Sequence, residues 1–453
     1  MSRTKAEKLA DPNYVPFWKN MAWQTRGISI GCVVVIVTSY LSFYCTNVLG
    51  MTPMLVGSLL MFSKIFDSFT DLVAGYIVDN TNTRFGKGRT YEFSIIGAWI
   101  CTYALFSTPE SWGPTGKAIW VFLLYTMVFS VFQTLLAAAE TPYYIRAFHT
   151  PQAIAKVAAT GGIVLSLGCM VVSMTFPMFV AQIGTNAPGW RKLVAMYAIP
   201  LALLGILRFF FVKETPFPGQ DETAVQKANE EKVRFKDILI MLKSNKFVWL
   251  LAFAVMIPQL IQGMAVGTYY FGSVVGDMSK YGLIQMCSIV MLLFMFFFPT
   301  LMKKHSVMNL TMYVSVIAIF GYVLLFFAYK NLILLIIGTI ISALATLPGS
   351  YMRPPIIMQI SEFNVTKGLP KMEASISAVC NFFVKIGGAL GSFLMGLLLQ
   401  LGGYVGTAAE QTDKAIMSIR CAYSFIPAVL MIIPIVCCIL FRPLDNMKLG
   451  QQS

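Results

Sequence analysis

The chain has 453 residues, of which 57% are hydrophobic and only 12% are charged. Soluble proteins carry about 25% charged residues, so this composition excludes most water-soluble classes and predicts a surface that largely faces lipid. The formal net charge of +14 does not require nucleic acid as a partner, because membrane proteins collect Lys and Arg in cytoplasmic loops, where these residues contact anionic lipid.

The hydropathy pattern predicts twelve transmembrane helices. The first six lie near residues 27–46, 54–79, 91–109, 118–141, 158–182 and 193–212. The last six lie near residues 247–271, 281–302, 309–328, 331–355, 372–401 and 416–441. We therefore expect an all-α membrane protein of the major facilitator type, with an N-terminal six-helix bundle and its tail (1–212), a cytoplasmic linker (213–246) and a C-terminal six-helix bundle with a short tail (247–453). Two such bundles are typical of secondary transporters that work by alternating access.

The distribution of basic residues predicts the orientation of the chain. An even number of spans places both termini on one side of the membrane, and that side carries most of the Lys and Arg. The opposite loops hold only a few: Lys117, Arg191, Lys192, Lys280, Lys330 and Lys414. By the positive-inside rule, both termini lie in the cytoplasm. We expect a monomeric, multi-pass protein of the cytoplasmic (inner) membrane.

The second predicted span contains three charged residues, Lys64, Asp67 and Asp71. They share one face of a helix, because positions three, four and seven apart lie above one another. Two carboxylates one turn apart in a low dielectric cannot both ionise without a compensating cation. We therefore expect a site for a proton or a monovalent ion, with Thr70 as a further oxygen ligand. The alternative is a structural ion pair between Lys64 and one carboxylate.

Charged residues also occur in the fourth and eleventh spans. Glu140 lies one turn before Tyr144, and a carboxylate beside an aromatic ring suits a small polyhydroxylated solute, because the acid accepts hydrogen bonds from hydroxyls while the ring packs against C–H groups. The alternative is a helix-end carboxylate bonded to loop donors. Lys385, with Asn381 one turn earlier, is a natural partner for the acidic stripe of the second span.

The remaining polar residues of the spans are weaker candidates. Four lie in the seventh span: Gln259, Gln262, Tyr269 and Tyr270. They either face a cavity or hold helices together, since both uses are common in membranes. Arg208 and Arg420 lie near span ends, and we expect their side chains to reach the membrane surface.

Two stretches resemble a known family. The run KIFDSFTDLVAGYIVDNTNTRFGKGRT, which begins at Lys64, resembles the signature of the glycoside–pentoside–hexuronide:cation symporters of the major facilitator superfamily. The segment SEFNVTKGLPKMEASISAVCNFFVKIGGALGSFLMGLLLQLGGY, which begins at Ser361, is similar to the tenth and eleventh spans of that family. The resemblance to the melibiose-carrier type implies that Asp67 and Asp71 bind the coupling cation, H⁺ or Na⁺, with Thr70 at a position where that carrier has Asn.

The same resemblance implies a set of substrate-binding residues. Glu140 matches a sugar-binding Asp, Tyr144 matches a Trp that stacks on the sugar, and Lys385 matches an intramembrane Lys close to both sites. Asn381 matches a neighbouring sugar contact, and Lys64 takes the place of an Arg beside the acidic pair.

The chain also departs from that pattern. A sugar-binding Asp of the first span falls at Gly31 here, and the Arg of the fifth span has no counterpart, which argues against a galactoside substrate. Leu72 replaces a Pro of the signature. Ala137 replaces a hydroxyl residue of the sodium site, which favours proton coupling.

The loop after the second span resembles the G-x-x-x-D-R-x-G-R-R element of the superfamily. It contains Gly75, Asp79, Arg84, Lys87 and Arg89. The resemblance implies a cytoplasmic gate whose charges latch the bundles on the inner face and release them on inward opening. The alternative is an ordinary basic loop on the cytoplasmic side.

These observations predict a secondary active transporter, a symporter of a sugar, glycoside or uronide with H⁺ or Na⁺, with no cofactor and no enzymatic activity. The alternatives are a passive facilitator or a symporter of another small polar solute. The pattern D-x-x-x-D also occurs in intramembrane prenyltransferases. Those enzymes use two acidic motifs, whereas the second half of this chain has none.

Overall fold

The computed structural model describes residues 14–81, 83–86, 88–148, 150–214, 235–287, 290, 307–344, 353–368, 372–408 and 410–449. All regular structure in these residues is helical, without a strand. The chain divides into two compact units: an N-terminal unit (Met1–Leu49 with Phe62–Val225) and a C-terminal unit (Gly50–Met61 with Gln226–Ser453).

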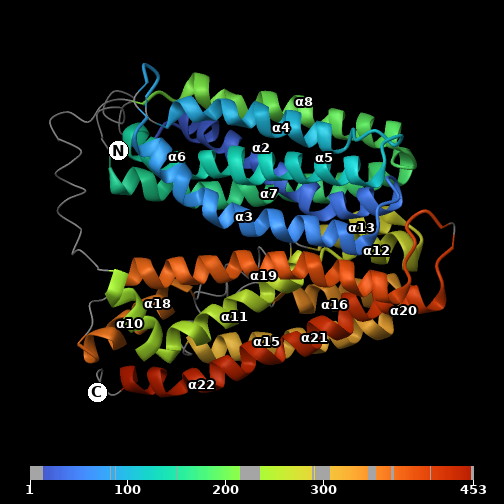
Figure 1. Ribbon diagram of the computed structural model, residues 1–453. Coiled ribbons are helices and arrows are strands. Elements are labelled where there is room, and N and C mark those ends of the chain that lie inside the picture. Colours follow the sequence, from blue (N-terminus) through green and yellow to red (C-terminus); the bar gives the residue numbers. More distant parts are fainter. Residues whose placement is uncertain are drawn as a thin grey trace, which may run out of the picture. The chain divides into compact units, whose positions relative to one another are not determined.

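The N-terminal unit is built from long apolar helices (Figure 1). Its described elements are α2 (Phe17–Asn47), α3 (Pro53–Asp79, whose first turns belong to the other unit), η1 (Arg89–Phe93), α4 (Ser94–Leu105), α5 (Pro114–Thr126), η2 (Met127–Gln133), α6 (Thr134–Phe148), α7 (Pro151–Ile183) and α8 (Ala187–Phe211). Caps set two of the starts: the Thr150 side chain accepts from the Ala153 N–H, and the Asn186 side chain accepts from the Gly189 N–H.

The first helix differs from the predicted span 27–46, because α2 begins at Phe17. Its early turns carry Trp23 and Arg26, whose side chains are buried among other helices of the unit rather than lying in a polar tail. α2 packs against α7 and α8. At Gly31, an added Cβ would lie 2.6 Å from Leu165 of α7, so this glycine permits the close approach of the two helices.

The C-terminal unit combines long helices with several short helical pieces. They are α10 (Phe235–Ser244), α11 (Lys246–Gly263), α12 (Gly267–Tyr269), η3 (Tyr270–Val275), α13 (Met278–Met286), α15 (Val307–Ala328), α16 (Leu332–Ala343), α18 (Arg353–Thr366), α19 (Glu373–Gly402), α20 (Asp413–Arg420), η5 (Cys421–Phe425), α21 (Ile426–Leu430) and α22 (Ile432–Leu449). α11 and α19 pack closely through glycines: an added Cβ on Gly263 would lie 2.5 Å from the carbonyl oxygen of Gly388.

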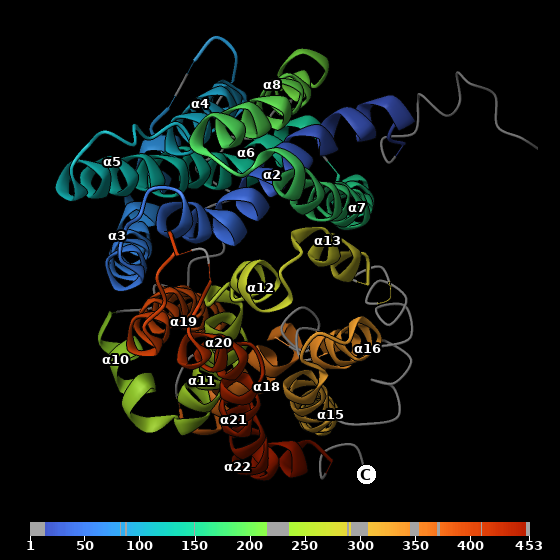
Figure 2. The ribbon, with the colours of Figure 1, turned by 90° about the vertical axis from the view of Figure 1, so that its right-hand side faces the viewer.

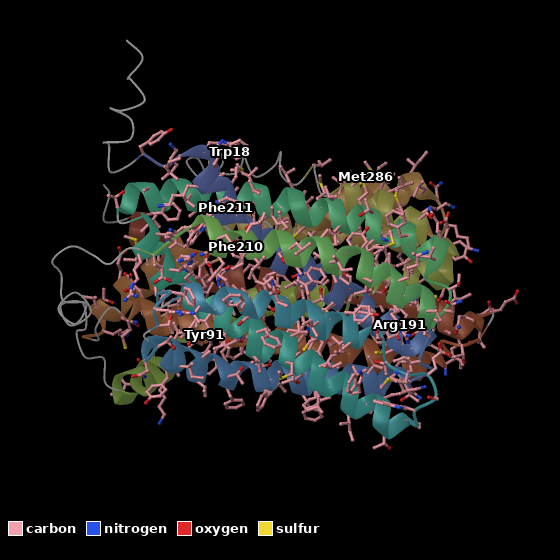
Figure 3. All side chains as sticks on the ribbon, turned by 90° about the horizontal axis from the view of Figure 1, so that it is seen from above. Trp18, Tyr91, Arg191, Phe210, Phe211 and Met286 are labelled. Atoms are coloured by element: carbon pink, nitrogen blue, oxygen red, sulfur yellow. The ribbon has the colours of Figure 1, made fainter. Side chains whose placement is uncertain are left out.

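Eight helical segments among the described residues are long and apolar enough to cross a membrane: Phe17–Asn47, Pro114–Phe148, Lys156–Ile183, Ala187–Phe211, Lys246–Val275, Met308–Ala328, Ser375–Gly402 and Asp413–Leu444. Of the predicted span 281–302, only residues 281–287 and 290 are described, and the span 331–355 is described except for 345–352. Large apolar side chains project outward, among them Trp18, Phe210 and Phe211 (Figure 3), which are 80%, 60% and 67% exposed. Such a surface suits lipid rather than water.

Candidate functional site

The two carboxylates of α3 converge on one hydroxyl group of α6. Thr134 Oγ1 lies 3.1 Å from Asp67 Oδ1 and 3.2 Å from Asp71 Oδ1. It is also 3.0 Å from the carbonyl oxygen of Phe129. A hydroxyl has a single hydrogen and two lone pairs, so it donates to one of these oxygens at a time. The result is a cluster of oxygen atoms of the kind that holds a proton or a hard monovalent cation.

Thr134 was not among the residues expected at this site from the sequence. This residue is 6% exposed and begins α6 directly after η2, a π-helical segment whose hydrogen bonds span five residues instead of the four of an α-helix. Such a segment rotates the residues that follow it and is frequent at functional sites. A hydroxyl residue within an apolar span could have marked Thr134 as a candidate. The regular 3.6-residue period of an α-helix, however, does not predict which way Thr134 faces after a π-helical segment.

The other expected members of the cation site lie on the same helix. Thr70 Oγ1 donates to the carbonyl oxygen of Asp67 at 3.0 Å, so its hydrogen is used within α3. Lys64 is half-buried one turn before Asp67. One turn towards the start of α3, Ser63 Oγ lies 2.8 Å from Thr126 Oγ1 of α5. Hydroxyl groups of α5 and α6 therefore both contact α3.

Glu140 lies in a buried network of two acids and two bases. Its carboxylate pairs with Arg26 of α2 and with Arg208 of α8, where Nη1 lies 3.1 Å from Oε2. Glu92 of η1 joins the same two bases: its Oε1 is 3.4 Å from Arg26 Nη1 and 3.5 Å from Arg208 Nε. The side chain of Glu140 is 29% exposed, while that of Glu92 is fully buried. Glu140 is thus the accessible member of a charge-balanced group.

The expectation that Arg208 reaches the membrane surface is wrong. Its side chain is 1% exposed, and its guanidinium group lies between carboxylates and aromatic rings inside the unit, with Nη1 donating to Glu140. The guanidinium carbon lies 3.2 Å from the centre of the Trp23 ring and 4.6 Å from that of Tyr143, which is favourable cation–π geometry. The ring of Tyr144 packs on Trp23 at 4.3 Å and so lies beside this network.

The loop expected to form a gate is bound to the end of α8. The backbone N–H groups of Gly88 and Arg89 donate to Glu214 Oε1, at 2.8 Å for Gly88. Arg89 Nε donates to the carbonyl oxygen of Phe209 at 2.8 Å, and Arg146 Nη1 lies 3.5 Å from Glu214 Oε2. Glu214 was not among the residues expected at this site from the sequence.

The other expected gate residues are described only in part. Arg84 is exposed, and its guanidinium group lies 4.6 Å from the centre of the Phe85 ring. Gly75 and Asp79 belong to the last turns of α3. Lys87 lies outside the described residues.

The expected substrate residues of the C-terminal unit lie on α19. Arg353 Nη2, at the start of α18, donates to Asn381 Oδ1 at 2.9 Å. Lys385 is half-buried one turn further along α19. The contact with Arg353 gives the exposed amide of Asn381 a fixed orientation.

Comparisons with known proteins identify the family. The sequence profile of the family described as MFS/sugar transport protein matches residues 27–446. The chain is 28% identical to an uncharacterised symporter, YnaJ, of Bacillus subtilis, over 91% of this chain and 88% of that protein. It is 25% identical to the isoprimeverose transporter of Lactiplantibacillus pentosus, over 94% and 88% of the two chains. It is 24% identical to a glucuronide carrier protein homologue of Escherichia coli, over 95% and 94%.

Solved structures show the same fold at low sequence identity. A D-xylose–proton symporter aligns with a TM-score of 0.64 at 15% identity, over 93% of this chain and 96% of that one. A bacterial homologue of the lysosomal transporter Spinster aligns with a TM-score of 0.68 at 13% identity, over 98% of both chains. The expected fold class, the expected family and the expected absence of an enzyme activity are therefore confirmed. The chain belongs to the MFS/sugar transport protein family and is an all-α membrane transporter of the major facilitator superfamily, not an enzyme.

Proposed function

We propose that this transporter moves a sugar, glycoside or uronide together with H⁺ or Na⁺, by alternating access. The family, described as a sugar transport family, supports this proposal. So do relatives named as a symporter, an isoprimeverose transporter and a glucuronide carrier homologue. Two of these names contain a solute, isoprimeverose in one and a glucuronide in the other. Both solutes are small polyhydroxylated molecules.

The observation that carries the proposal is the approach of Thr134 Oγ1 to both Asp67 and Asp71. Two carboxylates and a hydroxyl are hard oxygen ligands, and a cation or proton between the acids relieves their mutual repulsion. We propose that Thr134 supplies the hydroxyl that is missing at Ala137, so that both H⁺ and Na⁺ are candidates for the coupling ion. We assign Asp67, Asp71 and Thr134 to the coupling-cation site, with Thr70 beside them.

We propose that the Glu140 carboxylate binds the substrate and that two arginines determine its orientation. The pairs with Arg26 and Arg208 fix the direction in which the carboxylate can accept hydrogen bonds from sugar hydroxyls. Tyr144 offers an aromatic ring next to it. Lys64, Asn381 and Lys385 complete the proposed substrate set.

We further propose a monomeric protein of the cytoplasmic membrane with both termini in the cytoplasm. Residues 1–212 and 247–453 would act as the two bundles, and 213–246 as the linker between them. We also propose a cytoplasmic gate of Gly75, Asp79, Arg84, Lys87 and Arg89. The hydrogen bonds from the Gly88 and Arg89 N–H groups to Glu214 hold this loop against its own unit.

Transport assays with purified protein in liposomes test this function. The wild-type protein should accumulate a labelled sugar against its gradient when an inward Na⁺ or proton gradient is imposed, each in a separate experiment. Asp67→Asn and Asp71→Asn should abolish accumulation, because either change removes a charge that the cation must neutralise. Equilibration without accumulation by the wild-type protein would establish a passive facilitator instead, and unimpaired accumulation by both variants would refute the cation site.

A further inference from the structure

The C-terminal unit contains a partly open cavity of about 220 Å³. It lies where α11 breaks before α12, and residues of α13, α15, α16, η5 and α21 complete its wall. Figure 2 shows this unit from the end at which α12 and α13 lie. The described lining includes neither Asn381 nor Lys385, so the cavity is separate from the substrate residues that the sequence predicts for this unit.

The lining combines neutral hydrogen-bonding groups with aromatic rings. Gln262 and Gln285 contribute amides, and Tyr281, Tyr322 and Tyr423 contribute phenols. Amides and phenols both donate and accept, as the hydroxyl groups of a sugar do. None of the described lining residues carries a charge. Packing of rings against C–H groups together with a few polar contacts is typical of sites for small uncharged ligands.

Neighbouring aromatic groups hold two of these rings in place. Tyr423 stacks on Tyr270, with ring centres 4.3 Å apart and an angle of 24° between the planes. Tyr270 in turn donates its hydroxyl to the carbonyl oxygen of Tyr329 at 2.6 Å. Tyr281 stacks on Phe271 at 5.3 Å and 28°. Rings fixed before a ligand arrives lose little entropy on binding, which raises affinity.

The backbone at the helix break makes room for this arrangement. Ala265 has a φ of +48°, in the left-handed region that is unfavourable for a residue with a Cβ. At Gly267, an added Cβ would lie 2.6 Å from the hydroxyl oxygen of Tyr281. The absence of a side chain at Gly267 therefore lets the Tyr281 ring lie against α12. Strained residues of this kind cluster at ligand sites.

We propose that this cavity binds one uncharged sugar ring of the transported solute. The amides of Gln262 and Gln285 bond its hydroxyls, and the rings of Tyr281 and Tyr423 pack against its C–H groups. Sites for drug-sized ligands occupy roughly 300–1,000 Å³, so this cavity suits a single ring. A uronate is disfavoured, because its carboxylate would lose hydration beside a lining whose described residues supply no cation. The inference rests on the proposed sugar transport and adds a preference for neutral sugars.

Equilibrium binding to the purified full-length protein tests the inference. The probes are D-xylose, D-glucose and D-glucuronate. Glucuronate differs from glucose only in having a carboxylate in place of the CH₂OH group. We expect a neutral sugar to bind at least tenfold more tightly than glucuronate. Tyr423→Phe and Gln285→Leu each remove a hydrogen-bonding group and should weaken binding of the neutral sugar roughly three- to tenfold. Gly267→Ala should weaken it as well, because the new methyl group displaces Tyr281.

Tyr404→Phe is the matched control, since the Tyr404 hydroxyl lies 3.2 Å from Ser273 Oγ in the same unit and does not line the cavity. It should leave the affinity unchanged, and thermal unfolding should show that each variant is folded. If the wild-type protein accumulates a neutral sugar but the Tyr423 and Gln285 variants bind it normally, the cavity is a structural one and the inference is wrong, while the proposed function stands. Tighter binding of glucuronate than of glucose would also overturn the inference alone. If the wild-type protein neither binds nor transports any of the sugars, both proposals fail.

Discussion

Arg208 Nη1 lies 3.1 Å from Glu140 Oε2, and the same guanidinium group reaches Glu92 at 3.5 Å. One buried cation thus ties α8 to α6 and to η1. Because Arg208 is 1% exposed, its removal would leave two carboxylates facing a single base, Arg26. Removing one partner of a buried ion pair typically destabilises a protein by about 3–5 kcal/mol, because the remaining charge stays buried without compensation.

We therefore expect Arg208→Met to lower the free energy of unfolding by about 3–5 kcal/mol, measured by thermal unfolding in detergent. The double variant Arg208→Met/Glu140→Gln should recover part of that loss, because it removes one charge of each sign. Arg191→Met is the matched control, since Arg191 lies exposed on the same helix (Figure 3). A single variant as stable as this control would show that the network does not hold the helices together.

A second prediction concerns the hydroxyl between the two acids. Thr134→Val keeps the shape of the side chain but removes the group that contacts Asp67 and Asp71. A hydrogen bond to a charged group is worth about 1.5–3 kcal/mol, so the cation concentration for half-maximal uptake should rise at least about tenfold. Thr134→Ser should retain most of the affinity.

Thr126→Val serves as the control for that experiment, because the Thr126 hydroxyl contacts Ser63 of α3, at 2.8 Å. It removes a hydroxyl eight residues before Thr134 and leaves the hydrogen-bonding hydroxyl at Thr134 in place. An equal loss in the Thr126 and Thr134 variants would point to helix packing rather than to cation binding.

The sequence predicted some parts of this molecule better than others, for physical reasons. The span 54–79 agrees closely with α3 (Pro53–Asp79) because a long apolar run between a proline and polar residues fixes both ends. Asp67 and Asp71 were placed on one face by the helical period alone. Partners far along the chain were not predictable: Thr134 is 63 residues from Asp71, and its direction depends on the π-helical turns of η2.

The charged network was missed for a related reason. Basic residues near span ends are usually assigned to the membrane surface, and Arg26 and Arg208 fit that rule by position. Their burial depends on Glu92 and Glu140, which come from other helices. Hydropathy scores each segment by itself and contains no information about such pairings. The predicted first span therefore began after the charged Arg26, whereas α2 begins at Phe17.

Asn381 gives a third prediction. Its Oδ1 accepts from Arg353 at 2.9 Å, while its side chain is exposed. Asn381→Asp preserves the acceptor and converts the contact into an ion pair, but it removes the amide N–H groups that would bond a sugar. We expect normal stability with a severalfold higher KM for sugar uptake. Asn381→Ala should show the same rise in KM and a lower Tm, because it also removes the partner of Arg353. An Asp variant with an unchanged KM would mean that Asn381 acts through Arg353 alone.

The last prediction concerns the loop that follows α3. Glu214 accepts hydrogen bonds from the N–H groups of Gly88 and Arg89, and its side chain is 3% exposed. At Gly86, whose φ is +116°, an added Cβ would lie 2.3 Å from Glu214 Oε2. Both Glu214→Ala and Gly86→Ala should therefore detach the loop, the first by removing the acceptor and the second by strain and collision.

A detached loop exposes its backbone to protease, so trypsin should cleave after Arg84 several times faster in both variants than in the wild-type protein. Mass spectrometry of the fragments separates this cut from cuts elsewhere. Glu110→Ala is the matched control, because Glu110 is an exposed acid of the same unit in another loop. If the loop acts as a gate, the two variants should also change the rate of sugar uptake while the cation dependence stays the same. Faster cleavage with an unaltered rate of uptake would show that the loop is held in place by Glu214 but does not gate transport.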